Sequence, residues 1–170
     1  MTRGDIKLRT PIDPQFSQLW IVDSGTTKEA EAGEPCFCDD ATAASPWTGE
    51  AGIGSDGNGS TSQRFAGIAK SDSTETTAAA GEVYTWMPLP GIIYSGKALL
   101  STTADTAAEI KALHGKRVVF DLTGTAWTVD AAAADAAANC VTIVGGDHNT
   151  TTLFFVYAFK GTYLGFCVSA

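Results

Sequence analysis

The sequence predicts a mainly β fold, a small β-barrel or sandwich with one short α-helix and an extended N-terminal arm. Short runs of β-branched and aromatic residues recur between Gly-rich turns, and a single segment carries a complete helix pattern. A length of 170 residues, 44% of them hydrophobic, suits one domain with a sizeable core. We therefore expect one β-rich domain over residues 17–170, preceded by an arm over residues 1–16.

The expected arm is basic within an acidic protein. Residues 1–16 contain Arg3, Lys7 and Arg9 against two aspartates, and two prolines interrupt the segment. One interpretation is a frayed terminus. The other is an extended arm that becomes ordered on a negatively charged neighbour.

The strand candidates share short runs of branched and aromatic residues. They are residues 16–22, 64–69, 82–87, a run starting at 92, 118–122, 126–129, 140–144, 152–159 and 161–168. Pro88, Pro90 and Gly91 lie between the third and fourth of these runs, where they stop a strand and permit a change of direction. We expect two strands to meet at this proline corner, with most of the core around them.

The remaining segments predict turns and one helix. Residues 41–63 are rich in Gly, Ser and Thr and predict a flexible surface loop, without the pattern of a phosphate-binding loop. The alanine-rich residues 131–139 fit a helix or a loop equally well, and residues 145–149 predict a turn. Residues 105–114 predict a helix, with Thr106 and Glu109 as a capping box and Gly115 at the C′ position.

Composition excludes several classes of protein. The net charge is −8, which argues against nucleic-acid binding. No apolar run is long enough for a membrane helix, and the N-terminus lacks the apolar region of a secretory signal, so we expect synthesis in the cytoplasm. Charged residues make up only 18% of the chain, which leaves neutral surface that a partner can bury.

No motif predicts catalysis, a metal site or a cofactor. Asp147 and His148 are the one adjacent His–carboxylate pair, but no nucleophile motif accompanies them and a turn explains both. His114 is expected to be a helix-end residue. The acidic residues Glu29, Glu31 and Glu34 lack calcium-loop spacing and are expected to be solvated. The four cysteines lack zinc-knuckle spacing and are expected to be reduced and buried: Cys36, Cys38, Cys140 and Cys167.

Aromatic residues suggest one further contact. Four tryptophans are present, and most are expected in the core. Trp47 differs because the loop around it is polar, so it is a candidate anchor for a protein interface.

The order of several segments resembles the head decoration, or cement, proteins of tailed bacteriophages. The resemblance covers about residues 33–157 and rests on hydrophobic strand patterns. The matching segments are GEP at 33–35, FAGIA at 65–69, PLPGIIYSGKA at 88–98, GKRVVFDL at 115–122, WTVD at 127–130 and VTIVGGD at 141–147.

This resemblance implies a non-enzymatic virion protein on the outer capsid surface. Such a protein stabilises the capsid by clamping neighbouring subunits of the major capsid protein, commonly as a homotrimer, and needs no cofactor, nucleic acid or membrane. From composition and position, we expect Arg3, Lys7, Arg9 and Trp47 to contact the capsid. The alternative is an exposed β domain of the virion that binds carbohydrate or a host surface.

Overall fold

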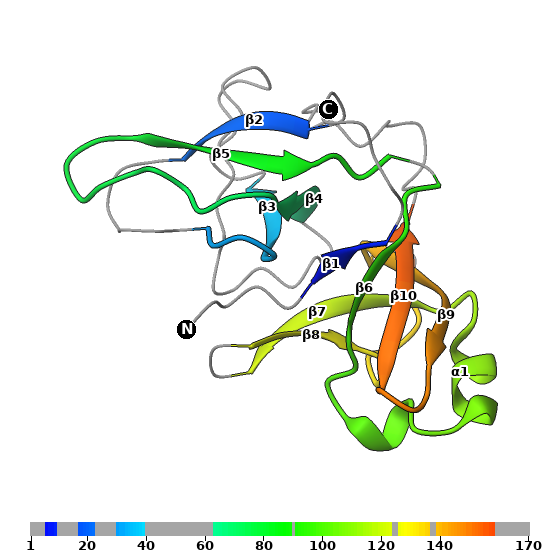
Figure 1. The fold of residues 1–170 in the computed structure, drawn as a ribbon. Helices are drawn as coiled ribbons and strands as arrows, with labels where there is room; N and C mark the ends of the chain where they lie inside the picture. The colour runs from blue at the N-terminus through cyan, green and yellow to red at the C-terminus, as the bar shows by residue number, and fades with distance from the viewer. Residues whose placement is uncertain are drawn as a thin grey trace.

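The computed structural model describes residues 6–9, 17–22, 30–39, 63–89, 91–123, 126–136 and 139–158, and it confirms a mainly β fold. The strands are β1 (Lys7–Leu8), β2 (Ser17–Val22), β3 (Pro35–Asp39), β4 (Gln63–Ala69), β5 (Gly81–Trp86), β6 (Tyr94–Lys97), β7 (Arg117–Thr123), β8 (Ala126–Asp130), β9 (Val141–Asp147) and β10 (Thr152–Tyr157). A 3-10 turn, η2 (Ser101–Thr103), precedes the helix α1 (Ala107–Leu113). The strands form two sheets of antiparallel ladders (Figure 1).

The six-stranded sheet has the order β1-β6-β10-β9-β7-β8 and curls toward closure. Its β8 edge returns to the residues after β6, where Ala98 bridges Val129 and the N–H of Leu99 donates to the Val129 carbonyl at 2.9 Å. Among the described residues this is a single bridge, so the sheet stays open and is not a closed barrel.

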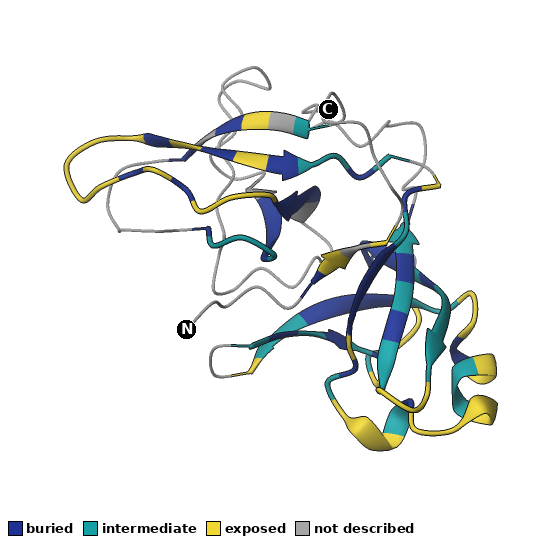
Figure 2. Cartoon of the chain, in the orientation of Figure 1, coloured by how far each residue is buried: buried dark blue, intermediate teal, exposed yellow. Residues whose placement is uncertain are grey.

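The four-stranded sheet, β2-β5-β4-β3, packs one face against the curled sheet. Phe37 and Phe65 project from it toward Phe120, with ring centroids 6.0 and 5.5 Å from that ring. Phe120 also meets Phe155 edge-on at 5.4 Å. Such pairs each add about 0.5–1.5 kcal/mol to the gain from burial. Buried residues therefore run along β3, β4 and β7 (Figure 2).

The other face of the four-stranded sheet carries a second, smaller core. It consists of Trp20, Val22, Ala30, Cys36, Ala66, Ala69 and Val83. The indole N–H of Trp20 donates to Thr85 at 2.8 Å, and the Thr85 hydroxyl donates to the Ala66 carbonyl at 3.0 Å, so the polar atoms in this core are paired. Alternating side chains thus bury both faces of β4.

The proline corner lies where it was expected, but it joins the two sheets. β5 belongs to the four-stranded sheet and β6 to the six-stranded sheet. The hydroxyl of Tyr94, the first residue of β6, donates to the Met87 carbonyl at 2.8 Å and fixes the corner. Tyr94 is buried in the main core, and the partly buried Trp86 packs against that core.

The helix confirms its sequence pattern. Thr106 is the N-cap, its hydroxyl accepts from the Glu109 N–H, and the Glu109 carboxylate accepts from the Thr106 N–H. Gly115 has a φ of 85°, which favours glycine. α1 packs against β9, and Ile110 lies where a side chain at Gly146 would point.

Several local predictions need correction or stay untested. β1 and β3 were not expected. The turn predicted at 145–149 is wrong in its bounds, because β9 continues through Gly145 and Gly146 to Asp147 and bulges against β10. The alanine-rich segment forms turns over its described residues, since the Asp130 carboxylate accepts from the N–H groups of Ala132 and Ala133.

The strand expected at 161–168 and the loop expected at 41–63, except Gln63, lie outside the described residues.

Candidate interaction surface

Strand β1 places basic residues of the predicted arm at the edge of the six-stranded sheet. Lys7 lies opposite Ser95 of β6, and the N–H of Arg9 donates to the Ile93 carbonyl at 2.7 Å. Ile6 is only 3% exposed and belongs to the main core. The segment fits closely because Gly96 has no side chain: a Cβ there would come within 2.5 Å of Ile6 Cδ1. Residues 6–9 are therefore part of the sheet.

The guanidinium group of Arg9 is held by two neighbours. Its Nε donates to the Ser95 hydroxyl at 3.2 Å, and its Cζ lies 4.8 Å from the centroid of the Phe154 ring. Ser95 is buried, whereas Arg9 is exposed. A cation over an aromatic face contributes about 0.5–1 kcal/mol at an exposed site. These contacts orient Arg9 without removing it from solvent.

Three further side chains lie on the face of the sheet that carries Lys7 and Arg9, because residues directly opposite each other in a sheet point to the same side. One row across three strands contains Lys7, Ser95 and Phe154. Lys97 follows Ser95 by two positions and so lies on the same face. We call Lys7, Arg9, Ser95, Lys97 and Phe154 the basic face.

One carboxylate lies in the neighbouring row. Lys97 pairs with Thr152, which pairs with Asp147 of β9. A hydrogen bond from Thr150 holds the pKa of Asp147 below its ordinary value, with smaller contributions from Asn149 and the charge of His148. The Lys97 ammonium donates to the Thr150 carbonyl of the same turn. The Asp147 carboxylate is thus already engaged by its own turn, and among the described residues of this face Lys7 and Arg9 keep a local excess of positive charge.

The structure brings together two of the four predicted contact residues. Lys7 and Arg9 lie on the basic face, while Arg3 and Trp47 lie outside the described residues. Sequence reasoning missed Ser95, Lys97 and Phe154. The alternation within residues 94–97 would have placed Ser95 and Lys97 on one side of a strand, but no sequence signal pairs β1 with that strand.

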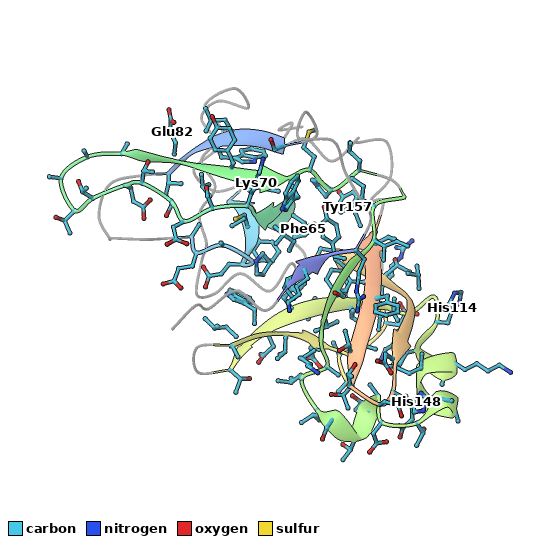
Figure 3. All side chains as sticks on the ribbon, in the orientation of Figure 1. Phe65, Lys70, Glu82, His114, His148 and Tyr157 are labelled. Atoms are coloured by element: carbon cyan, nitrogen blue, oxygen red, sulfur yellow. The ribbon has the colours of Figure 1, made fainter. Side chains whose placement is uncertain are left out.

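A second exposed surface lies on the four-stranded sheet. Leu19 of β2 and Tyr84 of β5 are directly opposite each other and are 43% and 45% exposed. The ammonium of Lys70 lies 4.7 Å from the ring centroid of Trp86, two positions after Tyr84. Figure 3 shows Lys70 and Glu82 near β5. This surface presents aromatic and apolar groups between opposite charges.

The histidines and described cysteines, which were considered as catalytic or metal-binding residues, lie on separate elements or are buried. His114 caps the end of α1 and His148 lies in the β9–β10 turn, on separate elements (Figure 3). Cys36 and Cys140 are buried, and burial raises the pKa of the Cys36 thiol, with a further increase from the charge of Glu34. Within the described ranges, no three His, Cys, Asp or Glu side chains are grouped to hold a metal ion. Cys167 and the Cys38 side chain lie outside that description.

The expectation that Glu34 is solvated is wrong. Glu34 is 1% exposed and lies between the two sheets, where its carboxylate accepts from the indole N–H of Trp127 at 3.1 Å and from the Glu31 N–H at 2.9 Å. A carboxylate can be buried when N–H donors satisfy its oxygens. The run of acidic residues gave no sign of these donors.

Comparisons with known proteins assign no family. No family model, curated protein or solved structure matches the chain. In the described part of the chain, no helix is long and apolar enough to cross a membrane.

Proposed function

We propose that this protein is a virion structural protein that binds the outer surface of a bacteriophage capsid and stabilises it by clamping neighbouring major capsid subunits. The observation that supports this proposal is the basic face, where Lys7 and Arg9 are held by a strand of the folded domain. The proposal also depends on the resemblance of the segment order to phage head decoration proteins. The homotrimer that this resemblance implies stays a prediction.

Charge distribution gives the proposed contact its physical basis. The chain has a net charge of −8, yet Lys7, Arg9 and Lys97 project from one sheet face. A local basic face directs an acidic protein toward an acidic partner in one orientation. Many copies placed by capsid symmetry would then add modest contacts into a large stabilisation.

The first test is co-sedimentation with expanded, undecorated phage heads, followed by a thermal scan of those heads. We expect saturable binding and a higher melting temperature of the heads. A folded protein that does not bind at any salt concentration would contradict the capsid role.

Substitutions test the contact better than deletion of residues 2–12. The deletion removes Ile6 from the core and would unfold the sheet edge as well as remove charge. The double variant Lys7→Ala/Arg9→Ala should weaken head binding. Lys70→Ala/Lys111→Ala removes the same charge at exposed positions away from the basic face and should bind normally.

The second candidate is an exposed β domain that binds carbohydrate or a host surface. Tyr84 favours it, because an aromatic ring exposed on a sheet offers a stacking surface. This candidate predicts that the isolated protein binds glycans or host cells and that Tyr84→Ala abolishes binding. Head binding that is unaffected by Tyr84→Ala, with no glycan binding, would reject it.

A further inference from the structure

Arg9 keeps hydrogen-bonding capacity that the described residues do not use. A guanidinium carries five N–H donors in a planar fork. Its Nε–H is taken by Ser95, and one face of the plane lies on Phe154. Among the described residues, its terminal amino groups make no hydrogen bond. Within that part of the chain the guanidinium is therefore held at Nε and keeps the edge best suited to an acceptor with two oxygens.

The surroundings of Arg9 are both cationic and apolar. Lys7 and Lys97 lie on the same face, and Phe154 and Val156 of β10 are half-buried there. Val156, two positions after Phe154, lies opposite Thr142 of β9. Neither of these two residues has a carboxylate. An incoming group would meet positive charge and an apolar surface together.

We propose that the basic face binds carboxylate side chains on a partner protein, with the Arg9 guanidinium as the receptor and Phe154 as the apolar floor. This inference rests on the proposed function for the partner's identity, and it adds the partner's chemistry. A fixed planar fork recognises a carboxylate through two parallel hydrogen bonds, which a lysine cannot reproduce. Phe154 packs against apolar atoms beside that carboxylate.

Nucleic acid and anionic membrane fit this face less well. Both present extended rows of phosphates and are bound by long basic stripes or clusters. The basic face has three cations, Lys7, Arg9 and Lys97, grouped around an aromatic ring on a protein of net charge −8. Long-range repulsion of a polyanion therefore opposes binding, while one or two local carboxylates are attracted.

Ser95 acts as a positioning residue for Arg9. It is buried, and its hydroxyl accepts from Arg9 Nε and donates to the Lys7 carbonyl at 3.5 Å. Ser95→Ala leaves every charge in place but frees the guanidinium to rotate. Binding should weaken through the lost orientation, with the salt dependence unchanged.

The first experiment measures affinity for phage heads over a range of salt concentrations. Losing hydrogen bonds to a charged group should weaken binding of Arg9→Ala by at least about tenfold. Arg9→Lys should show most of that loss, although it keeps the charge. Lys111→Ala is the charge-matched control for Arg9→Ala. Head binding that is unchanged in Arg9→Ala, or fully retained in Arg9→Lys, would overturn the carboxylate receptor while leaving the capsid role intact.

The second experiment needs no capsid. The full chain is titrated with an N-acetylated, C-amidated Glu-Glu dipeptide, a DNA duplex or vesicles containing phosphatidylserine, and NMR follows the Arg9 Nε–H and the Phe154 ring. We expect the dipeptide alone to shift these signals, and Arg9→Ala and Ser95→Ala to reduce the effect. This result would support the receptor even if heads failed to bind. Shifts caused equally by DNA or vesicles, or confined to other residues, would overturn it.

Discussion

The carboxylate of Glu34 accepts a hydrogen bond from the indole N–H of Trp127, 3.1 Å away and 93 positions along the chain. Glu34 precedes β3 of the four-stranded sheet, and Trp127 lies in β8 of the six-stranded sheet. Both side chains are about 1% exposed. The bond therefore joins the two sheets at a point closed to water, where an unsatisfied polar atom is costly.

Replacing Glu34 should destabilise the whole fold. Glu34→Ala leaves the Trp127 N–H and the Glu31 N–H without these acceptors, which should cost about 3 kcal/mol of unfolding free energy. Glu34→Gln should lose less, because one amide oxygen can still accept. Urea unfolding measures both, and Glu82→Ala, at an exposed site, should stay within about 0.5 kcal/mol of the parent. Equal stabilities of Glu34→Ala and Glu82→Ala would show that the bond is unimportant.

Ile6 and Gly96 should behave as one packing unit. Gly96→Ala brings a Cβ within 2.5 Å of Ile6 Cδ1 and should cost about 1–3 kcal/mol through crowding. Ile6→Ala should cost about 2–4 kcal/mol through the cavity that it leaves.

In the double variant the smaller side chain at position 6 makes room for the new methyl group. Its loss should be less than the sum of the single losses by at least about 0.5 kcal/mol in a urea double-mutant cycle. Additive losses would mean that the two positions do not share this space. Gly96→Ala should also displace Arg9, which the NMR signal of its Nε–H reports.

The β9–β10 turn should respond to acid through Asp147. Its pKa lies below the ordinary value of 3.8, first because Thr150 donates to the carboxylate. A lowered carboxyl pKa stabilises the turn above pH 3.8, and this contribution disappears as the pH falls through the pKa in the folded state.

Carboxyl NMR titration should give a midpoint below 3.8 for the parent and a higher midpoint for Thr150→Val. Thr150→Ser keeps the hydroxyl and should restore the low value. A midpoint that does not change in Thr150→Val would assign the shift to the Asn149 contacts instead.

Cys36 should be chemically silent in the folded protein. The thiol is fully buried, and burial with the nearby charge of Glu34 raises its pKa, so the reactive thiolate is scarce. In a Cys38→Ser/Cys167→Ser background, iodoacetamide should modify Cys36 and Cys140 only in molecules that have unfolded. Increasing urea should accelerate the reaction in parallel with the unfolded fraction. Rapid modification of Cys36 without denaturant would contradict the packing of the second core.

Local chemistry explains which elements could be predicted. The capping box of Thr106 and Glu109 defines the start of α1 within a few residues of chain. Strands β4, β7, β8 and β10 follow compact apolar runs, and the prolines near residue 90 stop a strand wherever the chain lies in space. β1 and β3 lack such signals, because each is a strand only through its partner, β6 or β4.

The sequence by itself determined the mainly β class, the helix and its caps, the proline corner and the basic character of the N-terminal segment. Each depends on backbone preference or side-chain charge within a few positions. Only the tertiary structure decided that Glu34 is buried against Trp127 and that Ile6 fills the space above Gly96. It also decided that Arg9 lies over Phe154. These relationships join residues far apart in the chain, and sheet order and register, which local sequence does not encode, bring them within contact distance.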